Sequence, residues 1–177
     1  MRRIWVIGAS GSGKSTLAMA LAARLGVPWV ELDGLHHGPG WAEPDPAEFR
    51  ATVAHELARD GWVVDGSYRE KLGDMVPEAA DTIVWLDLPL RVTVRRMLWR
   101  SARRWWQQTE LWNGNRESLR GVLGGRESLL YWSIKKHRQY RRKLPADFAG
   151  PQYAGKQIVR LRSEREVRSW LAGVRPD

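Results

Sequence analysis

Residues 8–15 read GASGSGKS, and this octet stands between an apolar run and a helix-forming run. The run before it, RIWVI at residues 3–7, has the composition of a short buried strand. The run after it, KSTLAMALAARL at residues 14–25, has apolar residues at helical spacing, and Gly26 follows as a helix stop. The octet matches G-x-x-x-x-G-K-[ST], and a strand before it with a helix after it is the context that supports this pattern. Such a unit restricts the chain to α/β folds built on a parallel sheet.

The octet also predicts which atoms would hold a phosphate chain. Its glycines let the backbone curl so that several N–H groups point at phosphate oxygens, and the following helix N-terminus adds a favourable dipole. Lys14 would reach the β- and γ-phosphates, and Ser15 would bind Mg²⁺. The expected cofactors are therefore ATP and Mg²⁺. The predicted cofactor-binding residues are Gly8, Ser10, Gly11, Ser12, Gly13, Lys14, Ser15 and Thr16.

The rest of the chain alternates between strand-like and helix-like segments. Asp45 before Pro46 is an N-cap signature, and Ser163 with Glu166 is a capping box that opens a final helix ending near Gly173. We expect strands at 29–32, 62–65, 82–87 and 157–161, and helices at about 46–59, 90–105 and 125–143. The predicted fold is a three-layer α/β/α P-loop NTPase of the nucleoside/nucleotide kinase type, with a five-stranded parallel sheet, in one domain over residues 1–177.

Composition limits the class of protein further. The chain has no Cys, which excludes disulfides and thiolate metal sites and fits the cytoplasm. No stretch approaches the roughly 20 apolar residues of a membrane span. The guanine-reading N-K-x-D of GTP switches is absent, as is the strand ending in Asp-Glu of motor and helicase ATPases. A chain of 177 residues with these features favours a phosphoryl-transfer enzyme.

The net charge of +9 is concentrated in the middle of the chain. Residues 1–90 hold 8 Lys/Arg and 13 Asp/Glu, whereas residues 91–143 hold 15 and 3. A basic segment of this kind predicts an anionic partner. We interpret residues 100–128 as a lid-like insertion that gathers Arg around a triphosphate, with Arg116 among its glycines. The alternative is a nucleic-acid-binding face over residues 91–143, because basic and aromatic side chains together bind single strands.

Two strand ends supply candidates for catalysis and acceptor binding. Asp65 ends the strand at 62–65 on the ligand edge of the sheet, where it would hold Mg²⁺ together with Ser15, and Arg69 follows four residues later. Arg96 and Arg100 share one helix face and would neutralise the transferring phosphoryl group. Asp87 also ends a strand, either in the metal shell or in a turn.

The stretch ELDGLHHGPGW at residues 31–41 follows the second strand and is interpreted as an acceptor loop. Asp33 would orient or deprotonate an acceptor hydroxyl, or else hold a metal-bound water. His36 and Trp41 would contact the acceptor, Trp41 by stacking. His37 beside His36 does not complete the three or four ligands of a structural zinc site. The alternative is a rigid Gly/Pro turn with Trp41 in the core.

These residues resemble motifs of the adenylate kinase-like P-loop kinases. Asp65-Gly-x-x-Arg69 is similar to the D-G-F-P-R of that family, with Ser67 and Tyr68 in place of Phe and Pro, and Arg96 and Arg100 resemble the arginines that begin its lid. More closely, the chain resembles a bacterial subgroup described as adenylate kinase-related or as DNA topology modulation proteins. That subgroup combines a P-loop with L-D-x-L-[HY]-x-x-P-x-W and V-[IV]-D-G-x-Y, which residues 32–41 and 63–68 match.

The resemblance implies an ATP- and Mg²⁺-dependent kinase. It also implies that Asp33, Asp65, Arg69 and the basic lid surround the acceptor. Taken together with the motifs above, the predicted catalytic residues are Lys14, Asp33, Asp65, Arg69, Arg96 and Arg100, and the predicted substrate-binding residues are Asp33, His36, Trp41, Arg69 and Arg116. The expected partners are ATP and an unidentified nucleotide or small hydroxylated metabolite. Two other hypotheses stay open: an ATP-dependent nucleic-acid-binding protein and a regulator that hydrolyses ATP slowly. The oligomeric state is left open.

Overall fold

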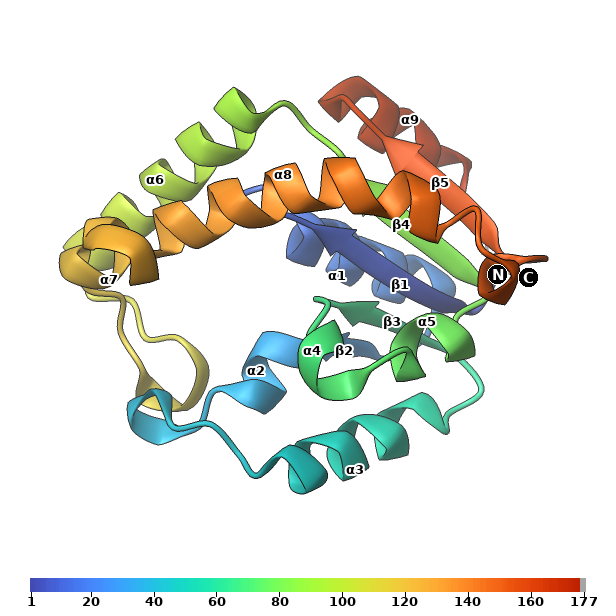
Figure 1. Cartoon of the computed structure of the whole chain (residues 1–177), viewed down its shortest axis with the longest axis horizontal. Helices are drawn as coiled ribbons and strands as arrows, with labels where there is room; N and C mark the ends of the chain where they lie inside the picture. The colour runs from blue at the N-terminus through green and yellow to red at the C-terminus, as the bar shows by residue number, and fades with distance from the viewer. Residues whose placement is uncertain (176–177) are drawn as a thin grey trace.

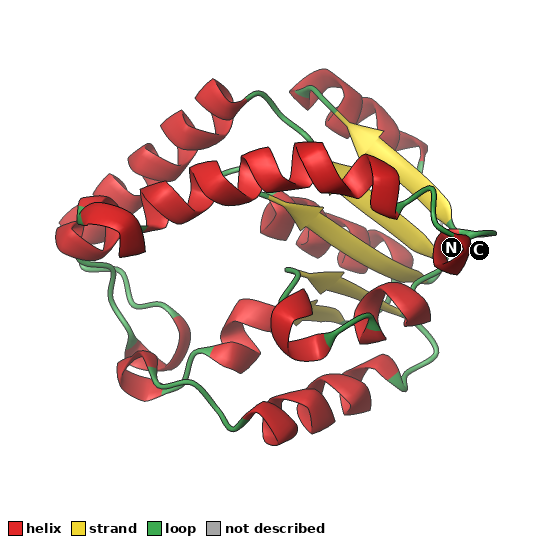
Figure 2. Cartoon of the chain, viewed as in Figure 1, coloured by secondary structure: helices red, strands yellow, loops and turns green. Residues whose placement is uncertain are grey.

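The structure, a computed structural model, describes residues 1–175 apart from the side chains of residues 119 and 127. Five parallel strands form one sheet in the order β2-β3-β1-β4-β5, with the arrows pointing the same way (Figures 1 and 2). The strands are β1 (Arg3–Gly8), β2 (Trp29–Glu31), β3 (Trp62–Asp65), β4 (Thr82–Leu86) and β5 (Gln157–Leu161). The predicted five-stranded parallel sheet is therefore confirmed.

Helices cover both faces of this sheet and make three layers (Figure 1). One core cluster joins the sheet to α1 (Lys14–Leu25) and α9 (Glu164–Gly173). The other joins it to α3 (Pro46–Leu57), α5 (Met75–Ala79) and α8 (Leu129–Asp147). The helix α6 (Leu90–Trp106) packs beside α8. The short elements are α2 (Leu32–His36), η1 (Pro39–Trp41), α4 (Arg69–Leu72), η2 (Trp112–Gly114), α7 (Leu119–Leu123), η3 (Gly125–Glu127) and η4 (Pro151–Tyr153).

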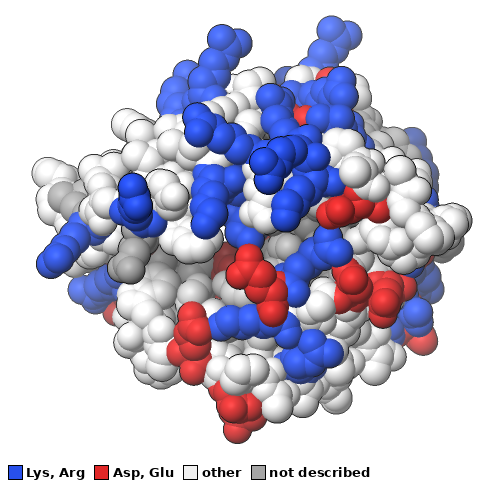
Figure 3. Space-filling view, in the orientation of Figure 1, with Lys and Arg blue, Asp and Glu red and all other residues white. Residues whose placement is uncertain are grey.

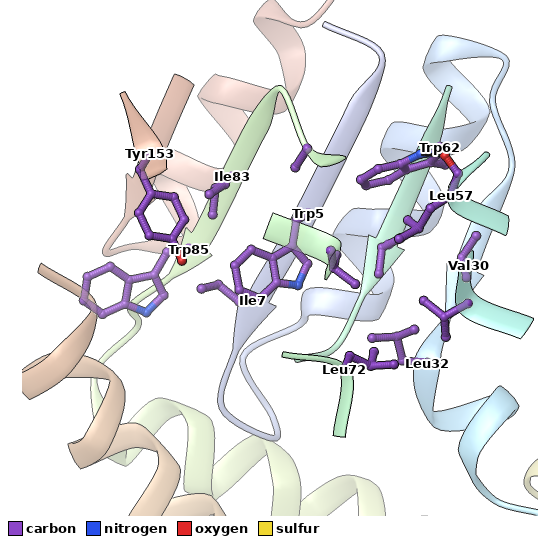
Figure 4. Packing of buried hydrophobic residues seen from close by; sticks show 14 of the residues in the cluster. Trp5, Ile7, Val30, Leu32, Leu57, Trp62, Leu72, Ile83, Trp85 and Tyr153 are labelled. Atoms are coloured by element: carbon purple, nitrogen blue, oxygen red, sulfur yellow. Dashed lines mark hydrogen bonds between the residues drawn. The ribbon is translucent and has the colours of Figure 1, made fainter. Parts of the chain in front are cut away.

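Tryptophan fills much of the core on the α3 and α8 face. Trp5 on the central strand lies between Trp62 and Trp85 of other strands, and all three are at most 2% exposed (Figure 4). The indole N–H of Trp5 donates to the carbonyl oxygen of Gly66 at 2.6 Å. This bond ties the loop after β3 to the centre of the sheet, so the buried core also positions residues at the sheet edge.

The helix-end predictions are confirmed. Asp45 accepts hydrogen bonds from the N–H groups of Ala47 and Glu48, which start α3. Gly26 closes α1 in the left-handed conformation at φ 66°. At α9, Ser163 caps the N–H of Glu166, and the Glu166 carboxylate reaches back to the N–H of Arg162 at 2.8 Å, which lowers its pKa.

Some expected boundaries are wrong. Leu32 begins α2 and does not end β2, because the chain turns into a helix as soon as it leaves the sheet. The helix α8 continues past Lys143 to Asp147, since Pro145 lies in its last turn, where a missing N–H removes only one helical bond. The stretch between α6 and α8 contains three short helical elements, and no helix was predicted for the first two, η2 and α7. Among the described residues, no helix is long and apolar enough to span a membrane.

Asp87, after β4, joins elements that are distant in sequence. Its buried carboxylate accepts from Arg141 of α8 at 2.6 Å and from Arg160 of β5 at 2.6 and 3.0 Å, and Arg160 lies over the ring of Trp85. Asp87 does not line the cleft described below. It therefore anchors α8 to the sheet, and the metal-shell interpretation of Asp87 is wrong.

We expect Asp87→Ala to lower the free energy of unfolding by about 2 kcal/mol, because two guanidinium groups lose their shared carboxylate. This is below the roughly 3–5 kcal/mol of a fully buried pair, since both arginines are partly exposed. Urea denaturation measures the change. The control Arg59→Ala breaks the exposed Arg59–Glu56 pair of 3.1 Å and should cost less than about 1 kcal/mol. Equal losses in the two variants would contradict the anchoring role.

Candidate functional site

A cleft of about 1350 Å³ opens at the edge of the sheet where the strands end. Its walls come from the loop after β1, the α2–η1 segment, the loop after β3, α6, residues 111–122 and α8. Figure 3 shows Lys and Arg gathered over the half of the molecule where α8 crosses the view, and most visible Asp and Glu in the other half. The surface visible in this view is therefore more basic on the α8 side of the molecule.

The glycine-rich loop is shaped by close packing against α6. Gly11 has φ 79°, and a Cβ there would lie 2.1 Å from the carbonyl oxygen of Thr93. A Cβ on Gly8 would lie 2.5 Å from Oγ of Ser12. Gly13, at φ 89°, precedes α1 without a side-chain cap. The loop thus leaves the N-terminus of α1 open at the cleft, as phosphate binding requires.

Lys14 joins the two halves of the cleft. Its ammonium nitrogen lies 3.5 Å from Oδ1 of Asp65 and 3.9 Å from Oδ2 of Asp33. Burial disfavours the ammonium, but the two carboxylates outweigh it, and the pKa of Lys14 is raised. Burial raises the pKa of Asp65, against the opposing effect of Lys14 and of the Ser15 hydroxyl. The structure therefore brings Lys14, Ser15, Asp33 and Asp65 together, as the sequence predicts.

Arg96 and Arg100, the two α6 arginines that we predicted as catalytic, lie in different surroundings. Arg100 lines the cleft and donates to Oγ of Ser10 at 3.1 Å, and burial together with Arg104 lowers its pKa. Arg96 does not line the cleft and pairs with Glu164 of α9 at 2.8 Å. Its guanidinium still lies near the glycine-rich loop, because a Cβ placed on Gly13 would be 3.9 Å from Nη1 of Arg96. Arg100 is thus placed to face the phosphates, whereas Arg96 borders the loop from outside.

Tyr68 lines the cleft, although we did not predict it as a site residue from the sequence. Its hydroxyl donates to Oδ1 of Asp33 at 2.7 Å and lies 3.3 Å from Nε2 of His37. Burial and the Asp33 carboxylate raise the pKa of Tyr68 far above its usual range, so it remains a donor. Its φ of 41° is strained for a tyrosine. Tyr68 is the last residue of the V-[IV]-D-G-x-Y pattern, a signal that points to it.

The predicted acceptor residues of α2 and η1 line the cleft in different ways. His36 is 3% exposed, and its Nε2 lies 2.6 Å from Nζ of Lys71. Burial and Lys71 lower the pKa of His36. Trp41 is 41% exposed and meets the rings of His37 and Trp112 edge-on at 5.3 and 6.4 Å. The prediction that Trp41 faces a ligand space is in line with its position, and the alternative that places it in the core is wrong.

Residues 112–115 contact the acceptor loop, residues 31–41, although the two segments are far apart in the sequence. The indole of Trp112 donates to Glu31 at 2.6 Å. Asn113 donates to the carbonyl oxygen of His37, and Asn115 donates to that of Gly38 while accepting from the N–H of Trp41. The segment that we interpret as a lid therefore closes one end of the cleft by specific bonds.

Arg69 and Arg116 line the cleft with their charges already paired. Arg69 contacts Asp74 at 2.5 Å and Asp147 at 3.1 Å. Burial works against the charged form of Arg69, but these carboxylates raise its pKa. Arg116 pairs with Glu110 at 2.9 Å. Neither guanidinium is free toward an acceptor in this arrangement.

The residues at the loop fit a magnesium–nucleotide complex. Both Asp65 oxygens are buried and, within the described chain, lack a hydrogen-bond partner at normal distance. Such a carboxylate beside the Ser15 hydroxyl suits a hard cation that keeps waters and phosphate oxygens as its other ligands. No group of three or more His, Asp or Glu residues in the described part of the chain is arranged to hold a metal ion by itself. The nucleotide phosphates would have to complete the shell.

Comparisons with known proteins agree with this geometry. No protein-family model matches the chain. An adenylyl-sulfate kinase of Chloroflexus aurantiacus is 36% identical over 110 residues, which cover 52% of this chain and 59% of the relative. The chain thus matches little more than half the length of that relative.

Solved structures show the fold more completely. A shikimate kinase from Acinetobacter baumannii in complex with shikimate aligns with a TM-score of 0.56 at 14% identity, over 97% of this chain and 89% of its own. A shikimate kinase from Bacteroides thetaiotaomicron gives 0.53 at 17%, over 97% and 94%. The fold is therefore the three-layer α/β/α fold of small P-loop kinases.

We expect Gly11→Ala and Gly13→Ala to differ sharply in their effect on stability. Both substitutions place an L-residue at positive φ, which costs about 1–2 kcal/mol. The new Cβ at Gly11 would also collide with the α6 backbone, whereas that at Gly13 meets only Arg96 at 3.9 Å. Gly11→Ala should lower the free energy of unfolding by at least about 3 kcal/mol and Gly13→Ala by about 1 kcal/mol. Denaturant titration measures both, and equal losses would show that α6 does not shape the loop.

Proposed function

We propose that the chain is an ATP-dependent kinase that transfers the γ-phosphoryl group to a nucleotide or small hydroxylated acceptor. The observation that carries this proposal is the position of Lys14 between Asp65 and Asp33, because it joins the phosphate-binding loop to the loop after β2. A donor phosphate held by Lys14 then lies beside a carboxylate that can receive a proton. The adenylyl-sulfate kinase relative and the kinase fold support the same class of reaction.

In the proposed reaction the acceptor hydroxyl oxygen bonds to the γ-phosphorus while the bridging P–O bond to ADP breaks. The bond's electron pair stays on the ADP oxygen, and the hydroxyl proton passes to Asp33. Tyr68 holds Oδ1 of Asp33, which leaves Oδ2 facing Lys14 and the acceptor. Lys14 and Arg100 neutralise the charge that develops on the phosphates. Bound Mg²⁺, held by Ser15 and Asp65, would supply further charge neutralisation.

The proposal has two further parts: the protein acts in the cytoplasm, and residues 100–128 act as a lid. We expect Arg96 and Arg116 to approach the phosphates when this lid closes over ATP. For this approach, the pairs of Arg96 with Glu164 and of Arg116 with Glu110 would have to open. The stretch LDGLHHGPGW, which lines the cleft, supports membership of the adenylate kinase-related subgroup.

One observation favours a second candidate, an ATP-dependent nucleic-acid-binding protein. Trp99 and Trp106 of α6 are 74% and 81% exposed, and this helix contains six arginines and no acidic residue. Exposed rings beside cations suit stacking on single strands. Salt-dependent binding of oligonucleotides without phosphoryl transfer to any small acceptor would favour this candidate over the kinase.

Lys14→Ala should reduce ATP turnover at least about 100-fold, because the ammonium that neutralises the phosphates is lost. ADP formation with Mg-ATP and a panel of nucleosides, nucleotides, sugars and other metabolites measures turnover. Lys135→Ala removes an exposed lysine that lies over the ring of Trp132 and serves as the matched control. If ADP formation persisted in folded Lys14→Ala, the assignment of Lys14 to the phosphates of ATP would be wrong.

Asp33→Asn should abolish transfer while the affinity for ATP stays close to that of the wild type, because the proton acceptor is lost and the donor loop is intact. Tyr68→Phe should lose about tenfold in kcat with the same ATP affinity, since Asp33 loses the hydrogen bond that orients its carboxylate. Nucleotide titration and steady-state kinetics separate the two effects. Parallel loss of transfer and ATP affinity in Asp33→Asn would instead assign Asp33 to the metal.

A further inference from the structure

The cations on the acceptor side of the cleft are already neutralised by the protein. We define this side as the part of the cleft beyond Asp33, between the α2–η1 and α4 segments and α8. Each of five lysines and arginines there has a carboxylate within 3.2 Å. The pairs are Arg69 with Asp74 and Asp147, Lys71 with Glu43, Arg104 with Glu117, Arg116 with Glu110, and Lys136 with Glu70.

Arg69 is the cation whose position bears most directly on the acceptor. It adjoins Tyr68, the partner of Asp33, and therefore lies where a charged group of the acceptor would bind. Two carboxylates, Asp74 from before α5 and Asp147 from the end of α8, hold its guanidinium. An anionic group that entered here would have to displace both carboxylates and would meet their repulsion.

Among the described residues, two cleft cations have no carboxylate within 4 Å, and neither builds a phosphate site on this side. Arg100 donates to Ser10 of the glycine-rich loop and so belongs to the donor phosphates. Lys143 lies on an exposed turn of α8 as a single charge. Recognition of a phosphate or carboxylate usually needs convergent donors, most often an unoccupied arginine fork.

What this side does offer is ring faces and hydroxyl acceptors. Trp41, Trp112 and His37 form an aromatic wall, with the His37 and Trp112 rings 5.6 Å apart and tilted by 31°. Glu31 and Asp33 present carboxylate oxygens beside this wall. Aromatic faces with a few oriented acceptors bind uncharged rings that carry hydroxyl groups.

We propose that the acceptor is an uncharged, ring-bearing hydroxyl compound of the nucleoside or sugar class, without a phosphate, sulfate or carboxylate group. This inference rests on the proposed kinase function and names its substrate class. The aromatic wall holds the ring, Asp33 receives the proton of the reacting hydroxyl, and the Arg69–Asp74–Asp147 cluster closes the site to anions.

Inorganic phosphate is the probe that tests the charge argument. It is titrated by calorimetry onto protein saturated with a non-hydrolysable ATP analogue, so that the donor site is filled. The wild type should show no binding below about 10 mM, whereas Asp74→Asn/Asp147→Asn should bind phosphate at least about tenfold more tightly, since it frees the Arg69 fork. Adding Arg69→Gln to the double variant should remove that gain. Both acids are partly exposed, so the variants are expected to fold, and melting curves check this.

Two phosphate-binding results would overturn the inference. One is tight phosphate binding by the wild type that Arg69→Gln abolishes, and the other is no gain in the double variant. ADP formation with adenosine against AMP, and with glucose against glucose 6-phosphate, then distinguishes nucleoside from sugar. Faster turnover of either phosphorylated member also overturns it. Absence of ATP turnover with every acceptor, alongside the expected phosphate gain, would refute the kinase proposal and leave the charge argument standing.

Discussion

The ammonium group of Lys14 between the carboxylates of Asp65 and Asp33 is the interaction on which the rest of the site depends. These residues come from the ends of three strand-linked segments, and mutual attraction holds them together in a cleft where each alone would be costly to bury. The two carboxylates raise the pKa of the Lys14 ammonium group, which lies close to both of them. A donor loop and an acceptor loop thereby share one electrostatic centre, and ATP would enter an arrangement that is already formed.

Part of the positive charge of the chain forms ion pairs within the protein, whereas the composition by itself predicts only an anionic partner. Many lysines and arginines of residues 91–143 meet carboxylates from elsewhere: Arg96 pairs with Glu164, Lys136 with Glu70, and Arg141 with Asp87. These pairs attach α6 to α9, and α8 to the sheet and to the opposite wall of the cleft. Trp99 and Trp106 of α6 remain 74% and 81% exposed, so the basic segment has a paired inner side and an exposed aromatic outer side.

The parts of the fold that sequence reasoning predicted well are those set by neighbours along the chain. Strand alternation, the caps at Asp45, Ser163 and Gly26, and the glycine-rich loop all depend on residues within a few positions of one another. The short helices α2, α4 and α5 escaped prediction because four or five residues carry too little periodicity, and tertiary packing stabilises them. Tyr68 escaped for a related reason: its hydroxyl meets Asp33 across 35 positions of sequence.

The sequence by itself determined the phosphate-binding loop, the parallel sheet, and the placing of Asp65 at the end of a strand and of Asp33 just after one, because backbone sterics and hydrophobic periodicity act locally. Only the tertiary structure decided which charges remain available. Arg69 meets Asp147 across 78 positions, and Trp112 meets Glu31 across 81. Ion pairs and hydrogen bonds act over a few ångströms of space and carry no signature along the chain. Whether an arginine faces a substrate or a carboxylate of its own protein therefore becomes visible only when the chain is folded.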